Sequence, residues 1–431
     1  MTNRSKNRSL STLARTGLLG LAVAAIAGCG ALDELLSVDA PSRVSAADLE
    51  NPATAGLLVA SVANEFRCTL TYYAAASALT GNEWRDASNN SVLNIWDQRV
   101  HDTSGYGSQY ASADCGSGQP ALYRPMSRTR WLADYTLGLL SEWTTEEVPD
   151  KAAYEAEVAL YAGYSYILFG ESMCSVAFDE GPEQMPADAF NLAIARFDQA
   201  MAAGASGDIL HAAQVGKARA QLNLNQKSAA MSTASSVPDG FAFELHYSNA
   251  EAVTRNKLWE FNIDHQNVTV AEPYRDVRFA DTPDPRVAVN DANATNSQTG
   301  IAIFVSEKYP EPSSPIEMAG YAEAQLIVAE AHIEAGNLDG AVSIFNGLHR
   351  AAGLPAYEGD MTATALMTQL IYERAAENYL EGQHLQDLKR LNIPLYPPTG
   401  TDDGFGGAYG DEICFELPAT EFQNNPSISG G

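Results

Sequence analysis

The sequence predicts a mainly α-helical protein, in which paired helices form a scaffold and a loop-rich, partly β insertion packs on it. Apolar residues recur at three- and four-residue intervals over much of the chain, which is the period of an amphipathic helix. Two such segments, beginning at Ala218 and Ala329, align with each other without gaps. The stretch 241–315 between them is instead rich in Pro, Asn, Asp and aromatic residues, which indicates loops and a few strands.

Residues 1–28 have the three parts of an export signal, so they are separate from the fold. Four cations begin the segment, and the apolar run Gly17 to Ala27 that follows is too short to span a bilayer. Small residues then precede Cys29, which resembles the bacterial lipobox, in which the cysteine thiol is diacylated and becomes the first residue of the mature protein. The alternative is an ordinary signal peptide with an incidental cysteine. We expect lipidation at Cys29, and membrane attachment through the acyl chains alone.

The charge of the chain argues against nucleic acid as a partner. The formal net charge is −28, and removal of the four signal cations leaves −32 on the mature chain. A surface of this sign repels nucleic acid and anionic lipid headgroups, so neutral ligands or cations are the expected cargo. The alternative is that the acidity only keeps the protein soluble. The glycine-rich run 404–410 opens no predicted helix that could hold a phosphate, and no cofactor is expected.

Export also bears on the cysteines. Lipidation of Cys29 leaves Cys68, Cys115, Cys174 and Cys414, an even number in an oxidising compartment, for which three pairings are possible. Their spacing fits no zinc pattern. We favour Cys68 with Cys115 and Cys174 with Cys414, because each pair would tie a helix to a nearby loop or tail.

A short tether and a helix follow the lipidated cysteine. The tether covers 29–50, and the helix begins near Ala53, with Leu57, Val62 and Phe66 at helical spacing.

The next region, 80–118, changes in composition to Asn, Ser, Asp, Gly and aromatic residues, which indicates long loops. Long loops in a compact domain usually either bind something or are disordered. From Leu122 the chain becomes helical again, and we expect helix pairs within 122–236. One stripe of an amphipathic helix is formed there by Phe190, Ile194, Phe197 and Met201.

The internal repeat indicates the type of scaffold. "ARAQLNLNQKSAA" from Ala218 matches "AEAHIEAGNLDGA" from Ala329 in its small and aliphatic positions. In this alignment Asn225 corresponds to Gly336 at the turn. Asn and Gly are the residue types that best tolerate the left-handed conformation that ends a helix. The pattern is typical of tetratricopeptide-type helix pairs, with a further group expected within 320–391. The alternative is a chance match of two alanine-rich helices.

The stretch "YLEGQHLQDLKR" suggests chemistry but is better explained by structure. On one helix, Glu381 and His384 are three residues apart, as are His384 and Asp387, so these side chains can pair locally. Leucines supply an apolar face, and nothing in the segment activates a nucleophile. We expect helix-stabilising ion pairs beside a packing face.

Aspartates cluster in one further loop. Asp276, Asp281, Asp284 and Asp291 offer oxygen ligands for a cation, but their spacing is not that of an EF-hand. We expect solvated aspartates paired with arginine, and no metal site.

A longer segment resembles a known family. "YERAAENYLEGQHLQDLKRLNIP" is similar to the C-terminal signature of the SusD/RagB family of outer-membrane nutrient-binding lipoproteins, although Gln386 stands where the family often has an aromatic residue. The end of the chain, "CFELPATEFQNNPSI", resembles the family's closing segment, and the similarity runs from Cys29 to the C-terminus. The matching positions in the signature are Glu373, Arg374, Glu381, Gly382, Asp387, Leu388, Lys389 and Arg390.

The resemblance implies a binding protein and not an enzyme. Family members lie on the cell surface as a lid over a SusC-like, TonB-dependent barrel transporter and capture oligosaccharides or other nutrients for import. The implied fold is a single SusD-like domain over 29–431, in which four tetratricopeptide-like helix pairs support a loop-rich binding face. The implied location is the outer membrane, lipid-anchored and facing the exterior.

Sugar capture needs aromatic faces for stacking and polar side chains for the hydroxyls. Trp84 and Trp96 are the expected stacking platforms, and the alternative is that both lie in the core. The expected hydrogen-bonding partners are Asn82, Arg85, Asn89 and Arg99, with a second contribution from Tyr274 and Arg275.

Two other functions remain open from the sequence. A surface glycoside hydrolase of helical architecture would use a pair of carboxylates, which the sequence alone cannot single out. A pure tetratricopeptide scaffold would bind only protein.

Overall fold

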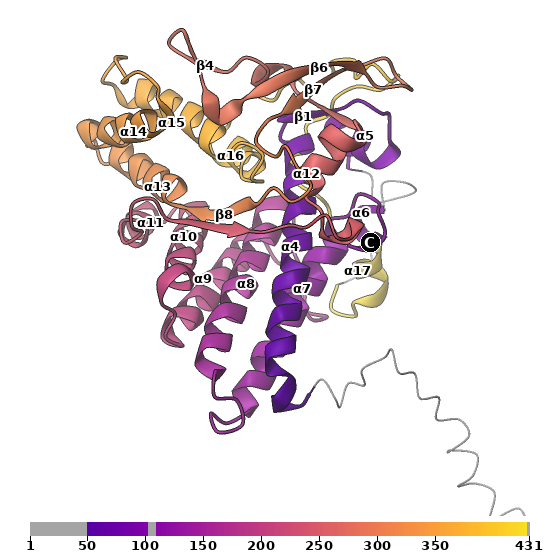
Figure 1. The fold of residues 1–431 in the computed structure, drawn as a ribbon, viewed down its shortest axis with the longest axis vertical. Coiled ribbons are helices and arrows are strands. Elements are labelled where there is room, and N and C mark those ends of the chain that lie inside the picture. The colour runs from indigo at the N-terminus through magenta and orange to yellow at the C-terminus, as the bar shows by residue number, and fades with distance from the viewer. Residues whose placement is uncertain (1–49, 102–108, 429–431) are drawn as a thin grey trace, which may run out of the picture. The chain divides into compact units, whose positions relative to one another are not determined.

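The computed structural model describes residues 50–101 and 109–428 (Figure 1). The export signal, Cys29 and the tether up to residue 49 lie outside these ranges. From Pro52 onward the chain forms one unit. Helices dominate this unit and the sheets are small, so the mainly α fold is confirmed.

Most of the helices form two groups. In the first, α4, α7, α8, α9 and α10 run side by side, and each contacts the next across apolar faces (Figure 1). The bounds of these five helices, followed by those of the short helix α11 that packs on α10, are α4 Ala55–Thr80, α7 Tyr123–Glu142, α8 Lys151–Ser172, α9 Pro186–Ala202, α10 Gly207–Asn223 and α11 Lys227–Ala234. The second group is α13 Tyr321–Glu334, α14 Leu338–Ala352, α15 Ala363–Glu377 and α16 His384–Arg390.

The repeat corresponds to two helix pairs, α10 with α11 and α13 with α14. Asn225 and Gly336 stand at the two turns with φ of 58° and 76°, the left-handed conformation that the sequence predicts. In the second pair Ile333 and Phe345 are buried together with Leu370 of α15. A third helix therefore closes the core that one pair leaves open.

The shorter helices include one inside the region expected to be loops. α5 occupies Ser91–Gln98, because the Asn90 side chain accepts hydrogen bonds from the first backbone amides and an apolar face packs inward. The region 80–118 is thus partly regular, which corrects the expectation. The other short helices are α6 Gln109–Ser112, α12 Lys257–Trp259 and α17 Ala419–Asn424.

The strands pair two by two, and every pair is antiparallel. Most lie in the insertion, as the sequence predicts, but β1 comes from the region after α4. The C-terminal "ICFEL" forms no named strand, only a parallel bridge between Met173 and Phe415. The pairs are β1 Trp84–Asp86 with β3 Val268–Val270, β2 Ala242–Leu245 with β8 Ile316–Gly320, β4 Arg278–Phe279 with β5 Thr282–Pro283, and β6 Val289–Thr295 with β7 Ala302–Ser306.

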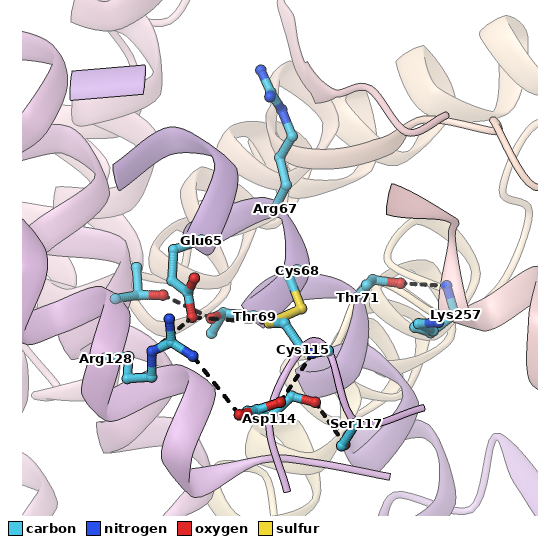
Figure 2. The surroundings of a disulfide bond; sticks show 12 residues. Glu65, Arg67, Cys68, Thr69, Thr71, Asp114, Cys115, Ser117, Arg128 and Lys257 are labelled. Atoms are coloured by element: carbon cyan, nitrogen blue, oxygen red, sulfur yellow. Dashed lines mark hydrogen bonds and ion pairs between the residues drawn. A yellow bond between two sulfur atoms is a disulfide. The ribbon is translucent and has the colours of Figure 1, made fainter. Parts of the chain in front are cut away.

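The four cysteines form the two disulfides that the sequence analysis favours. Cys68 of α4 is joined to Cys115 in the loop before α7, beside Glu65 and Arg128 (Figure 2). Cys174, just after α8, is joined to Cys414 near the C-terminus. Each bond therefore ties a helix to a distant loop.

The stretch "YLEGQHLQDLKR" is a turn followed by a helix and not one helix. Leu380 and Gly382 have φ of 59° and 86°, and α16 begins only at His384. A side chain at Gly382 would lie 2.6 Å from the Tyr73 ring, so the close approach requires glycine. The expected local pair of Glu381 with His384 does not form.

One local ion pair forms as expected, between Asp387 and Arg390 at 3.0 Å, and the stretch also makes tertiary ion pairs. Glu381 lies 2.7 Å from Lys308, and Asp387 lies 2.7 Å from Arg374 of α15. These contacts join the insertion and α15 to the signature helix, so the segment is structural.

The loop aspartates also differ in part from the expectation. Asp284 is paired with Arg286 at 2.6 Å as expected, but it is 2% exposed and not solvated. Arg286 also binds Glu373 at 2.7 Å, which anchors the insertion to α15.

Candidate functional site

Both expected stacking platforms lie in the core. Trp84 and Trp96 are each 1% exposed. Trp84 points inward from β1, and the Trp96 ring meets Phe415 edge-on at 5.9 Å. A ring without an exposed face cannot stack on a sugar, so the expectation of two exposed platforms is wrong.

Arg99 also has a structural role. It ends α5 with a left-handed φ of 55°, and its side chain is fully buried. The guanidinium donates hydrogen bonds to the carbonyls of Tyr396, Pro397 and Gly410 at 3.2, 2.5 and 3.0 Å. All its bonds go to backbone, so the expectation that Arg99 binds a ligand is wrong as well.

Two expected residues are brought together. Asn82, in the turn after α4, and Tyr274 line one cavity of about 270 Å³. We call this cavity the Asn82 pocket. Its walls are mostly apolar and also include Pro273, Tyr372, Ala376, His384, Pro394 and Tyr396.

The Asn82 amide is the distinctive group of the pocket. Asn82 is 5% exposed and has φ of 64°. Neither its Oδ1 nor its Nδ2 has a hydrogen-bond partner among residues 50–101 and 109–428. A buried amide left unpaired costs about 1–3 kcal/mol, so a group that both donates and accepts is favoured beside it.

Aromatic rings form the walls around this amide. Tyr274 is stacked on Tyr379 with ring centroids 5.2 Å apart, and it meets His384 edge-on at 5.9 Å. Burial lowers the pKa of His384 to about 4, so its ring is neutral at neutral pH. The walls therefore offer flat, uncharged surfaces.

A polar rim lies beside the pocket, consisting of Arg85, Glu272, Arg275 and Tyr396. The Tyr396 hydroxyl donates a hydrogen bond to the Glu272 carboxylate at 2.5 Å, and this tyrosine is 38% exposed. Burial, together with repulsion from Arg85, lowers the pKa of Arg275, whose guanidinium lies 4.1 Å from the Phe304 ring centre. Arg85 donates to the Asp403 carbonyl at 2.9 Å.

Asn89 does not line the pocket. It is exposed in the loop before α5, with a φ of 55°.

Sequence reasoning missed Tyr396, Tyr372 and His384. A signal for Tyr396 was present in "PLYPP", because prolines on both sides stiffen the backbone and can hold an aromatic ring at the surface. No comparable signal marks Tyr372 or His384, since each faces the pocket only through the packing of α15 and α16.

The chain matches known proteins in fold and in one segment of sequence. Residues 313–422 match the SusD family model. A SusD superfamily protein from Bacteroides vulgatus has a solved structure that aligns over 88% of this chain and 98% of its own, with 14% identity and a TM-score of 0.65. The resemblance to the SusD/RagB family is thus confirmed, in sequence over residues 313–422 and in fold over most of the chain.

Other solved structures have the same fold. A SusD-like carbohydrate binding protein from Bacteroides vulgatus shares 13% identity, covers 88% of this chain and 97% of its own, and has a TM-score of 0.66. A SusD superfamily protein from Bacteroides thetaiotaomicron shares 13% identity, covers 88% of this chain and 99% of its own, and has a TM-score of 0.67. No curated protein matches the sequence.

The helices were also compared with the requirements for crossing a membrane. Within the described ranges, no helix combines the length and the apolar character that crossing a bilayer requires.

Proposed function

We propose that this protein is a SusD-type surface lipoprotein that binds a glycan or related nutrient and delivers it to a SusC-like, TonB-dependent transporter in the outer membrane. The match of residues 313–422 to the SusD family model, and the fold shared with a SusD-like carbohydrate binding protein, support the binding role. The lipobox-like motif at Cys29 supports attachment through acyl chains alone. The protein acts without changing its ligand covalently.

The Asn82 pocket is the proposed binding site, and the unpaired Asn82 amide is the observation that carries it. A sugar hydroxyl both donates and accepts, so one hydroxyl can bond both amide atoms. The C–H face of the same sugar can lie against the neutral aromatic walls. The volume of the Asn82 pocket, about 270 Å³, is close to the lower end for small-molecule pockets, roughly 300 Å³. The pocket would therefore take one sugar ring or the end of an oligosaccharide.

The polar rim would hold the next part of the ligand. Arg85 and Arg275 each keep guanidinium donors beyond the hydrogen bonds that they make to the carbonyls of Asp403 and Val270, and the Tyr396 ring is partly exposed. Asn89 stands farther out and would contact only a longer ligand.

The test is the substitution Asn82→Gly, because glycine adopts a positive φ without strain while the amide is lost. Binding to an array of neutral oligosaccharides, built from glucose, xylose, mannose and galactose in α and β linkages, is measured by titration calorimetry. We expect N82G to weaken binding of the best oligosaccharide about tenfold, since a buried hydrogen-bonding partner is removed.

The matched control is Asn225→Gly, at an exposed turn with φ of 58° on another part of the scaffold. It makes the same chemical change at the same backbone conformation and should leave affinity unchanged. Equal affinity in N82G and the wild type would remove the pocket from the proposal. Release of reducing ends from any oligosaccharide would overturn the non-enzymatic role.

A further inference from the structure

A second groove lies on the helical scaffold and shares no lining residue with the Asn82 pocket. It is formed by the first half of α7, by α17 and by the turn after α8, and its volume is about 500 Å³. In Figure 1, α17 lies beside α7. We call it the Trp131 groove, and the residues that matter below are Trp131, Arg130, Asp179, Glu180 and Asn424.

Trp131 forms a fixed aromatic platform at one side of this groove. Its side chain is 52% exposed, whereas Trp84, Trp96 and Trp143 are buried. The ring is stacked on Tyr135, one helical turn later, with centroids 5.0 Å apart and planes 9° from parallel. The stack holds the indole in one orientation, so little conformational entropy is lost when a ligand covers it.

The charges on the floor of the groove neutralise one another. Arg130 is 6% exposed, and its Nη1 donates to both carboxylate oxygens of Asp179 at 2.8 Å. Its Nε has no acceptor within the described part of the chain. Arg128 is directed elsewhere, toward Glu65 and Asp114 beside the disulfide (Figure 2).

Polar groups at the edge remain available. Glu180 and Asn424 are exposed, and their side chains make no hydrogen bond to any residue the structure describes. A carboxylate and an amide of this kind bond hydroxyls well, because together they accept and donate. The groove therefore sets a flat, preoriented ring beside unengaged polar groups.

We propose that the Trp131 groove binds a neutral oligosaccharide, with Trp131 stacked on a sugar ring and with Glu180 and Asn424 bonding its hydroxyls. A wholly apolar ligand would leave these polar groups unpaired, and an anionic glycan would be repelled by Glu180 and by the acidic chain as a whole. This site is additional to the Asn82 pocket and does not depend on it.

Quenching of tryptophan fluorescence by acrylamide tests the proposal, because Trp131 is the tryptophan most open to the quencher. The measurement uses the full protein carrying N82G, with the same oligosaccharide array. At least one oligosaccharide should protect the fluorescence from acrylamide. Adding Trp131→Ala should weaken its binding, measured by calorimetry, roughly tenfold, while Trp131→Phe should retain most of the affinity.

The matched control is Leu57→Ala on α4, since Leu57 is 54% exposed and lies outside both sites. It should leave affinity within about twofold of the parent, a change of less than half a kcal/mol. Circular dichroism checks that each variant is folded.

Three outcomes would overturn the proposal. The first is that no oligosaccharide protects the fluorescence, and the second is that W131A binds as tightly as L57A. The third is that W131A no longer co-purifies with a membrane protein but still binds the oligosaccharide, which would assign this face to a protein partner. None of these outcomes alters the N82G result, so the proposals for the two sites are tested independently.

Discussion

Buried carboxyl groups near the loop-rich face make stability depend on pH. Burial raises the pKa of Glu83 to about 8, although the Leu380 amide donates to its Oε1 at 2.8 Å. Burial likewise raises the pKa of Asp97 to about 8 and that of Asp86 to about 6. Between pH 4.5 and 8 the native state therefore holds more protons than the unfolded state, and the free energy of unfolding falls as pH rises.

Replacing Glu83 with glutamine should remove part of this dependence. Glutamine keeps the acceptor for Leu380 and does not ionise. We expect the loss of unfolding free energy between pH 5 and pH 8, measured by urea denaturation, to shrink by at least about 2 kcal/mol in E83Q.

The control for E83Q is Glu244→Gln, the same change at an exposed position of β2. It should leave the pH profile as it is in the wild type. A profile for E83Q that parallels that of E244Q would show that Glu83 titrates normally in the folded protein.

Individual binding residues were the hardest feature to predict from the sequence. Trp84 and Trp96 stand among Asn, Ser and Asp, which suggested exposure, yet both point inward from short elements whose other faces are polar. The spacing of Val92 and Trp96 on one helical face was a signal for burial. Asn82 and Tyr274, both expected to bind a ligand, line one cavity, but this pocket depends on α15 and α16, which are far from Asn82 in the sequence.

At the scale of elements, close helix packing depends on glycines around one ring. The Phe197 ring of α9 lies against Gly163 of α8 and Gly216 of α10. A methyl group at Gly163 would lie 2.6 Å from the ring, and one at Gly216 would also overlap it. The ring thus fills a space that only glycine leaves open on each side.

Gly216→Ala should therefore destabilise the protein by about 1–3 kcal/mol through overpacking. The comparison is Gly138→Ala in α7, where an added methyl group meets nothing within 4 Å. G138A should stabilise the protein by about 0.5–1 kcal/mol, because alanine favours a helix over glycine. Thermal unfolding of both variants measures whether each substitution raises or lowers stability. Stabilisation by G216A would contradict the packing described.

Elements defined by local sequence were predicted better than elements defined by distant partners. The turns at Asn225 and Gly336 follow from residue type, and the structure places both in the left-handed region. The pairing of β1 with β3 joins Trp84 to Val270, and no local pattern specifies such a partner. The turn at Leu380 breaks a helix that the apolar spacing favoured, because tertiary ion pairs and the close contact with Tyr73 outweigh local periodicity.

At the scale of the whole molecule, the two disulfides differ mainly in the length of chain they close. Cys174 and Cys414 are 240 residues apart, whereas Cys68 and Cys115 are 47 apart. A disulfide stabilises largely by restricting the unfolded chain, and the effect grows with the logarithm of loop length.

Replacing either pair with alanine should lower the free energy of unfolding by about 2–4 kcal/mol. The loss should be about 1.4 kcal/mol greater for C174A/C414A, because its loop is longer. Urea unfolding of the two double variants measures the difference. A greater loss for C68A/C115A would mean that local contacts matter more than chain entropy.

Lipidation is the other property of the whole molecule that can be tested directly. Cells fed labelled palmitate should incorporate the label into the wild type but not into Cys29→Ala. The C68A/C115A variant, which keeps Cys29, is the control and should retain the label. Label in C29A would place the lipid on another residue and contradict the lipobox interpretation.

The buried Arg99 side chain also has a consequence for the export proposed above. Its acceptors are the carbonyls of Tyr396, Pro397 and Gly410, about 300 positions later in the chain. A polypeptide that crosses a membrane amino end first cannot finish its interior until those final segments have passed through. Such late completion would leave the chain open enough to be threaded through a secretion channel, and it would lock the structure only on the far side.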